Sequence, residues 1–105
     1  MDTDLFDIDA EKLKRMIQLH VRFWLFDLRD HTEFMAGHIS NAFNLPAADF
    51  LARLPSMVPQ KDTPIVIYDA DGSSAKDLAA QAVRHGFINL VYLDCGYKRY
   101  QLTFG

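Results

Sequence analysis

The sequence predicts one α/β domain built on an open, mostly parallel sheet of about five strands, with helices on both faces. Short apolar runs bounded by turn residues alternate along the chain with segments whose apolar residues recur at helical spacing. Such alternation is typical of parallel strands joined by helical crossovers. The chain has 105 residues, half of them hydrophobic, which is enough for one core and leaves no room for a second domain, so residues 1–105 are expected to form a single domain.

The first half of the chain begins with a strand expected near residues 5–8. Asp9 then serves as N-cap for a helix from Ala10 to about His20, and its core face is formed by Leu13, Met16, Ile17 and His20. FWLFDL, residues 23–28, is apolar almost throughout, as expected for a strand covered on both faces. The remaining elements expected here are one or two helical turns ending at Gly37, a strand at residues 42–45 closed by Pro46, and a weak helix from Ala47 to about Leu54.

The second half of the chain opens with a surface connection marked by Pro55, Pro59 and Pro64. A strand at residues 65–68 follows. From Ser74 a helix is predicted, because Leu78, Ala79, Ala82 and Val83 repeat at helical spacing and Gly86 with Phe87 forms a glycine stop with an apolar contact. NLVYL, residues 89–93, is the last strand, and GYKRYQ begins a terminal helix.

Ligands of such sheets bind beyond the carboxyl ends of the strands. Polar clusters follow three of the predicted strands, at residues 27–30, 69–74 and 94–96. The loop after Tyr68 is the best candidate, because successive backbone N–H groups at the start of a helix form a cradle for an anion. It contains Asp69, Ala70, Asp71, Gly72, Ser73 and Ser74.

Charge and hydropathy argue against several classes of partner. The formal charge is −3, from 14 acidic and 11 basic residues scattered along the chain, so neither a basic stripe nor nucleic-acid binding is expected. No apolar run is long enough for a membrane span, and MDTDLFDID does not resemble a secretory signal, so we expect a cytoplasmic protein without membrane contact. Cys95 is the single cysteine, which suits a reducing compartment.

DLRDHTEFMAGHISNAFNLP, residues 27–46, resembles the rhodanese-like (sulfurtransferase) family. The family signature is Asp-x-Arg, then Glu-aromatic, Gly-His-Ile and Ala-x-Asn-x-Pro. The similarity continues through PIVIY, HGF and LVYLDCGYKRY, and so covers nearly the whole chain. The matching positions within the signature are Asp27, Arg29, Glu33, Phe34, Gly37, His38, Ile39, Ala42, Asn44 and Pro46.

The resemblance gives Asp69 a specific meaning. In active members this position is a cysteine whose thiolate takes sulfane sulfur from a donor and holds it as a persulfide. Ser74 and Ala75 also stand where the family loop often has Arg-Ser. A carboxylate cannot carry a sulfur–sulfur bond. The resemblance therefore implies a domain without thiosulfate sulfurtransferase activity, with a binding or regulatory role, no cofactor, and a protein or a small anion as its unidentified partner.

Two enzymatic alternatives remain open. Cys95 falls where the family usually has glycine, at the same sheet edge, and so could carry sulfur or support a displaced transferase site; a lone cysteine is more often an idle small residue. DADGS also resembles the nucleophile loop of haloacid-dehalogenase-type phosphatases, with Asp69 as nucleophile, Asp71 as acid and magnesium between them. Only Asp94 is left as a further ligand, so no metal site is predicted. The simpler interpretation of the pair is a turn followed by a capping box of Ser74 and Asp77.

The remaining signature residues are expected to support the loop. Arg29 and Glu33, four apart, are predicted to form a local ion pair, and Asp27 to accept hydrogen bonds from loop backbone. His38 is interpreted as structural, and Tyr97 and Tyr100 as packing residues. His20, His31 and His85 show no metal-ligand spacing. Asp69 itself is predicted to fill the cradle as an internal anion that accepts two or three backbone N–H bonds.

Overall fold

The computed structural model describes residues 7–104, and these residues build a five-stranded sheet in the order β1-β5-β4-β2-β3. Every pair of neighbouring strands is parallel. This confirms the predicted fold class. Residues 5 and 6 of the expected first strand lie outside the described residues. The strands are β1 (Asp7–Ile8), β2 (Trp24–Asp27), β3 (Phe43–Asn44), β4 (Ile65–Tyr68) and β5 (Leu90–Leu93).

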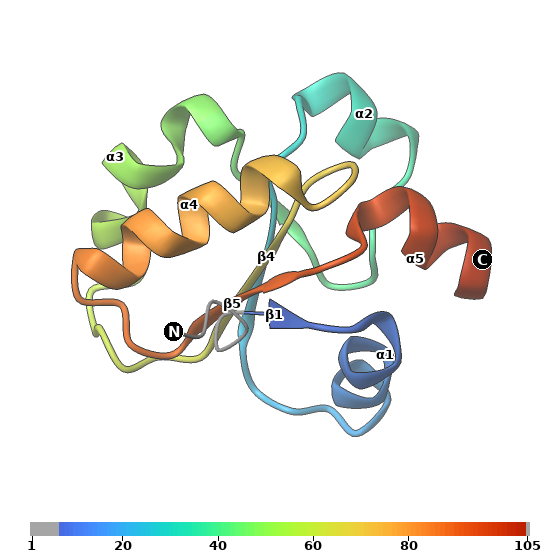
Figure 1. Cartoon of the computed structure of the whole chain (residues 1–105), viewed down its shortest axis with the longest axis horizontal. Coiled ribbons are helices and arrows are strands. Elements are labelled where there is room, and N and C mark those ends of the chain that lie inside the picture. The colour runs from blue at the N-terminus through green and yellow to red at the C-terminus, as the bar shows by residue number, and fades with distance from the viewer. Residues whose placement is uncertain (1–6, 105) are drawn as a thin grey trace.

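Helices cover both faces of this sheet (Figure 1). On one face, α3 and α4 contribute Phe50, Leu54 and Ala79 to a core with Phe26 of β2. On the other face, α1 and α5 pack against the sheet through side chains such as Leu13 and Tyr100. The short helix α2 has no buried residue. The helices are α1 (Ala10–Gln18), α2 (His31–Ala36), α3 (Ala47–Met57), α4 (Ser73–Arg84) and α5 (Gly96–Phe104).

The strand β2 lies inside the sheet, between β4 and β3, and not at an edge. Its side chains alternate between the two helical layers, because Leu25 belongs to the α1/α5 core and Phe26 to the α3/α4 core. Burial on both faces explains why this strand is a nearly continuous apolar run. The sheet ends with Asp27 of β2 and Tyr68 of β4 side by side, and this places the functional candidates at one edge.

Two helix boundaries differ from the sequence prediction. The helix α1 ends at Gln18, and His20 is exposed with a left-handed φ of 56°, so it does not share the core face with Leu13, Met16 and Ile17. The helix α3 continues through Pro55 to Met57. Pro55 is exposed there, while Leu54 and Val58 are buried, so packing of these flanking side chains outweighs the helix-breaking tendency of proline.

The predicted end of α4 is confirmed. Gly86 has a φ of 101°, and its N–H bonds to the Val83 carbonyl while the N–H of buried Phe87 bonds to the Ala82 carbonyl. This pair of bonds is a Schellman motif. Within residues 7–104, no helix is both long and apolar enough to cross a bilayer.

Candidate functional site

The loop between β4 and α4 folds around the carboxylate of Asp69. Asp69 is only 7% exposed. Its Oδ1 accepts the Gly72 N–H at 2.6 Å, and its Oδ2 accepts the N–H groups of Ser74 at 2.8 Å and Ala75 at 3.1 Å. Two or three backbone hydrogen bonds to Asp69 were predicted, and the structure has three. The carboxylate of the chain itself satisfies the free N–H groups at the start of α4.

Asp71, an exposed residue just before α4, also caps this helix. Its Oδ1 accepts the backbone N–H of Ser73 at 3.0 Å and the Ser73 hydroxyl at 2.7 Å. These two hydrogen bonds lower the pKa of Asp71. The predicted capping box of Ser74 and Asp77 is wrong, because both side chains are exposed and the first N–H groups of α4 already bond to the two upstream aspartates.

The Asp69 loop is held against the segment that follows β5. The Tyr97 N–H bonds to the Asp69 carbonyl at 2.8 Å, and the Lys98 N–H bonds to the Ala70 carbonyl at 3.2 Å. Gly72 has a φ of 95°, and a Cβ at this position would collide with the Asp94 carbonyl oxygen. The close approach of two backbones therefore requires glycine at position 72.

Cys95 lies in this adjoining segment. Its thiol is half-buried, and Sγ lies 3.6 Å from the Gly96 carbonyl oxygen. Burial and, next, the Asp94 carboxylate raise the pKa of the Cys95 thiol. Both effects favour the thiol over the thiolate, which is the opposite of what a reactive cysteine requires.

Asp27 forms a second buried site at the end of β2, and its carboxylate has no exposed surface. Oδ1 accepts the backbone N–H of Arg29 at 2.9 Å, and Oδ2 accepts Nη2 of Arg29 at 2.7 Å and the Tyr68 hydroxyl at 2.7 Å. The backbone bond confirms the expected role of Asp27. The predicted Arg29–Glu33 pair is wrong: Glu33 is exposed, and the guanidinium turns to the buried carboxylate, where water cannot compensate the charge.

The Tyr68 hydroxyl joins three segments of the chain. It donates to Asp27 and accepts the Ile39 N–H at 3.1 Å. The ring of Tyr97 stacks on Tyr68 with centroids 6.0 Å apart, and the Arg29 guanidinium lies 4.0 Å from the Tyr97 centroid. Burial raises the pKa of Tyr68, so the hydroxyl stays protonated. Sequence reasoning missed this residue, and its only signal was a polar atom at the end of the apolar run IVIY.

His38 has the geometry of a structural residue. Its ring stacks on Phe34 at 3.8 Å, and Nδ1 lies 2.9 Å from the Phe34 carbonyl oxygen, to which it must donate. This contact holds the loop after α2, as predicted. Among residues 7–104, no group of three or more His, Cys, Asp or Glu side chains is arranged to hold a metal ion.

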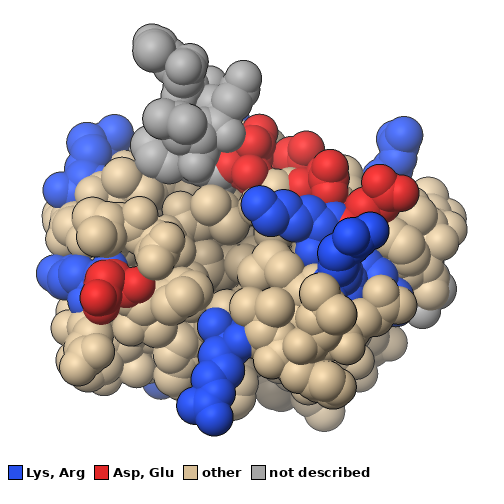
Figure 2. Space-filling model, turned by 90° about the horizontal axis from the view of Figure 1, so that it is seen from below, with Lys and Arg blue, Asp and Glu red and all other residues tan. Residues whose placement is uncertain are grey.

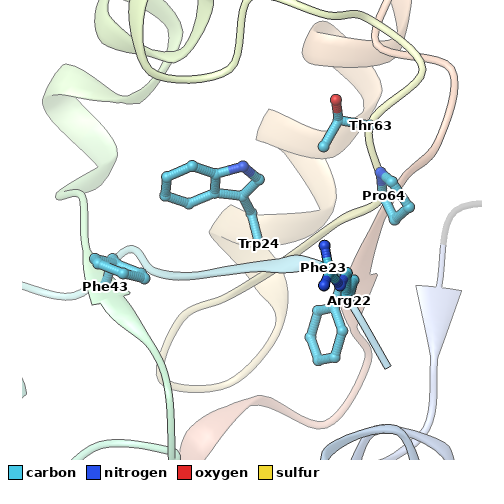
Figure 3. Close-up of a pocket in the computed structure, with 6 residues that line it drawn as sticks. All are labelled: Arg22, Phe23, Trp24, Phe43, Thr63 and Pro64. Carbon is cyan, nitrogen blue, oxygen red and sulfur yellow. The ribbon is translucent and has the colours of Figure 1, made fainter. Parts of the chain in front are cut away.

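A groove of about 400 Å³ lies at the opposite, amino-terminal edge of the sheet (Figure 3). Phe43 of the edge strand is 54% exposed, and its ring centroid lies 5.3 Å from that of Trp24. Phe23 and Trp24 point to opposite sides of the chain in this view, as consecutive strand residues do. Sequence reasoning did not identify this groove. It is lined by Arg22, Phe23, Trp24, Phe43, Thr63 and Pro64.

The arrangement can be compared with known proteins. The family model for the rhodanese-like domain matches residues 9–103. The chain belongs to the rhodanese-like family. The resemblance found in residues 27–46 is thereby confirmed, and the match covers almost all of this rhodanese-like domain.

Solved structures share its fold. The human single-domain sulfurtransferase TSTD1 superposes with a TM-score of 0.78 at 20% identity, covering 94% of this chain and 96% of that one. The Alr3790 protein from Anabaena sp. superposes with a TM-score of 0.84 at 25% identity, covering 93% of this chain and 77% of that one.

Curated relatives in sequence are named tRNA uridine(34) hydroxylase. The protein of Hamiltonella defensa subsp. Acyrthosiphon pisum is 31% identical over 81 residues, which is 73% of this chain and 23% of that protein. The protein of Photorhabdus laumondii subsp. laumondii is 27% identical over 111 residues, which is 95% of this chain and 31% of that protein. The chain thus spans less than a third of the length of these two relatives.

Proposed function

We propose that this rhodanese-like domain is a binding or regulatory module that does not transfer sulfur from thiosulfate. The observation that carries the proposal is the Asp69 carboxylate, whose two oxygens accept three backbone N–H groups at the start of α4. In active members, the resemblance places a persulfide-forming cysteine at this position. Here the side chain of the loop itself supplies the anion that the cradle would otherwise bind.

The chemistry of the loop supports this proposal. Sulfur transfer needs a polarisable nucleophile that can form and release a sulfur–sulfur bond, and a carboxylate does neither. The loop carries the charges of Asp69 and Asp71, which repel an anionic donor such as thiosulfate. The nearby cation Arg29 does not offset them, because its guanidinium is engaged by Asp27 and by the Gly37 carbonyl at 2.6 Å.

A sulfur-carrying role for Cys95 has less support. The thiol makes its polar contact with the Gly96 carbonyl, and burial beside Asp94 raises its pKa. A thiolate would therefore form only at a pH above the ordinary range for cysteine. Attack on a sulfur donor requires that thiolate, so Cys95 is poorly suited to accept sulfur at neutral pH.

A magnesium-dependent phosphatase site is also poorly supported. Both Asp69 oxygens bond to their own loop, and the Asp71 Oδ1 bonds to Ser73. Binding of Mg²⁺ by the pair would require these capping bonds to break or to be shared. No third protein carboxylate is placed with them in the described part of the chain.

The decisive assay measures thiocyanate formed from thiosulfate and cyanide. We expect wild type and Cys95→Ser to match the uncatalysed rate, and mass spectrometry to detect no persulfide on Cys95 after incubation with thiosulfate. An active rhodanese domain, assayed in parallel, validates the conditions. Turnover by wild type that disappears in Cys95→Ser would overturn the proposal and assign the chemistry to that thiol.

The names of the curated relatives favour a second, compatible proposal: the domain serves an assembly that modifies tRNA, through contacts with protein and not with RNA. Figure 2 shows one face on which acidic side chains gather beside basic ones, without a continuous basic surface. The chain carries a formal charge of −3, which opposes phosphate binding. The apolar groove around Trp24 and Phe43 offers a surface for a protein partner.

A mobility-shift titration with total tRNA tests this second proposal. We expect no shift at about 0.1 M salt, because the 11 basic residues are outnumbered by 14 acidic ones, so the net charge opposes phosphate binding. A shift that weakens steeply with added salt would show direct RNA contact and contradict the protein-only role.

A further inference from the structure

A small cavity of about 170 Å³ lies between α1, α5 and the connection from α2 to β3. By comparison, an engineered apolar cavity of about 150 Å³ accommodates benzene. The cavity is therefore large enough for a ring with one small substituent. Its polar side chains are Lys14, His38, Ser40, Tyr97, Tyr100 and Gln101, and Phe104 is among its apolar walls.

Several of these polar groups line the same cavity without forming hydrogen bonds or ion pairs with one another. Within residues 7–104, the hydroxyls of Ser40 and Tyr97 and the side-chain amide of Gln101 make no hydrogen bond to another protein group. Lys14 forms no ion pair with a described residue; its Nζ lies 5.4 Å from the Phe104 ring centroid. These donors are thus available to a ligand, because no internal hydrogen bond has to break before they can bind it.

The charge of the cavity has one sign. None of its lining residues is acidic, although the chain has more acidic than basic residues. His38 is already held by Phe34 through its Nδ1 and its stacked ring, so its position at the rim is fixed. A single ammonium beside neutral donors and an aromatic wall favours an anion with an apolar body.

We propose that this cavity binds a small organic anion, such as an aromatic monocarboxylate of the size of benzoate. In this assignment the carboxylate pairs with the Lys14 ammonium and accepts hydrogen bonds from the Ser40 and Tyr97 hydroxyls. The ring lies against Phe104. The class of ligand follows from the cavity's size, its positive charge and its mixed polar and apolar lining.

Tyr97 connects this cavity to the Asp69 loop. Its backbone N–H bonds to the Asp69 carbonyl at 2.8 Å, and its ring centroid lies 6.0 Å from that of Tyr68 and 4.0 Å from the Arg29 guanidinium. A ligand that contacts the Tyr97 hydroxyl would therefore contact the same residue whose backbone N–H holds the Asp69 loop. The anion is accordingly an effector of the loop, a consequence that rests on the regulatory function proposed above.

Nuclear magnetic resonance titration of the ¹⁵N-labelled full chain tests the site. Benzoate should shift the amides around Lys14, Ser40 and Gln101, while benzamide, neutral and of similar size, should bind about tenfold more weakly, as expected for loss of one charged hydrogen bond. Lys14→Gln should weaken benzoate binding by about the same factor. The matched control Lys76→Gln removes an equal charge from α4, on the other face of the sheet, and should leave binding unchanged.

Several outcomes would overturn the assignment. No benzoate binding, or equal binding of benzoate and benzamide, would remove the anion site. Equal loss in Lys14→Gln and Lys76→Gln would reduce it to a diffuse effect of net charge. If sulfate produced the same amide chemical-shift changes as benzoate, the site would not be specific for an organic anion. Binding without any shift at the amides of residues 69–75 would overturn the effector role. The sulfur-transfer assay has a separate readout, so failure of the proposed inactivity would not imitate any of these results.

Discussion

Two buried carboxylates stand at neighbouring strand ends, and different kinds of donor satisfy them. Asp27 is bound by the Arg29 guanidinium and the Tyr68 hydroxyl, with Tyr68 distant in sequence. Asp69 is bound by three backbone N–H groups within the next six residues. The Asp27 site is thus a tertiary network, whereas the Asp69 site is a local cap. Loss of the network should destabilise the domain more than loss of the cap, because it leaves a buried cation unpaired.

The largest expected effect is that of Asp27→Asn. Breaking a buried ion pair from one side costs about 3–5 kcal/mol, because the remaining charge keeps its desolvation penalty. Urea denaturation monitored by circular dichroism measures this loss. Glu33→Gln is the control, since Glu33 is exposed; it should change the free energy of unfolding by less than about 0.5 kcal/mol. A comparable loss of unfolding free energy in Glu33→Gln would indicate that Arg29 pairs with Glu33 after all.

Tyr68→Phe should cost about 1–2 kcal/mol, because it removes one donor from Asp27 and leaves the buried Ile39 N–H without its acceptor. The phenyl ring preserves the stacking on Tyr97. A double-mutant cycle with Asp27→Asn measures the coupling, which should be clearly non-zero for groups in direct contact. Additive losses would mean that the hydroxyl and the carboxylate act independently.

Asp69→Ala should cost about 1 kcal/mol, as loss of a helix cap does. The matched control Asp77→Ala, an exposed site on the same helix, should have little effect. The variant should also expose the N–H groups of the cradle, so that sulfate raises its melting temperature but not that of wild type. If sulfate stabilises both proteins equally, or Asp69→Ala leaves the unfolding free energy unchanged, the cap is not the role of this aspartate.

The smallest effect is expected for Asp94, whose pKa is raised by partial desolvation of its carboxyl and by the charges of Asp7 and Asp9. A raised pKa means that the folded state favours the protonated carboxyl, so this stabilisation is present at acid pH and is lost as the pH rises through the folded pKa. Asp94→Asn should therefore match wild type at acid pH and exceed its stability at neutral pH, by less than about 1 kcal/mol because the site is exposed. Denaturation across this range checks the sign; a variant less stable than wild type at neutral pH would contradict it.

Local patterns were sufficient for much of the fold. The strand at residues 65–68 and the glycine stop at Gly86 were predicted correctly, because apolar runs and left-handed turn residues act within a few neighbouring positions. The family resemblance came from residues 27–46, and the aspartate at position 69 could be read directly. That carboxylate's three N–H bonds were also foreseeable, since its donors are its own successors in the chain.

Only the tertiary structure decided which carboxylate forms the ion pair with Arg29. Both Asp27 and Glu33 lie within reach along the sequence, but strand pairing buries Asp27 beside Tyr68 and leaves Glu33 in water. A charge in water gains little from pairing, whereas a buried carboxylate is stable only with its partners. Packing likewise carried α3 past Pro55, and folding brought Lys14, Ser40 and Tyr97 around one cavity. Such arrangements depend on burial and on contacts between distant segments, which no local pattern of residues encodes.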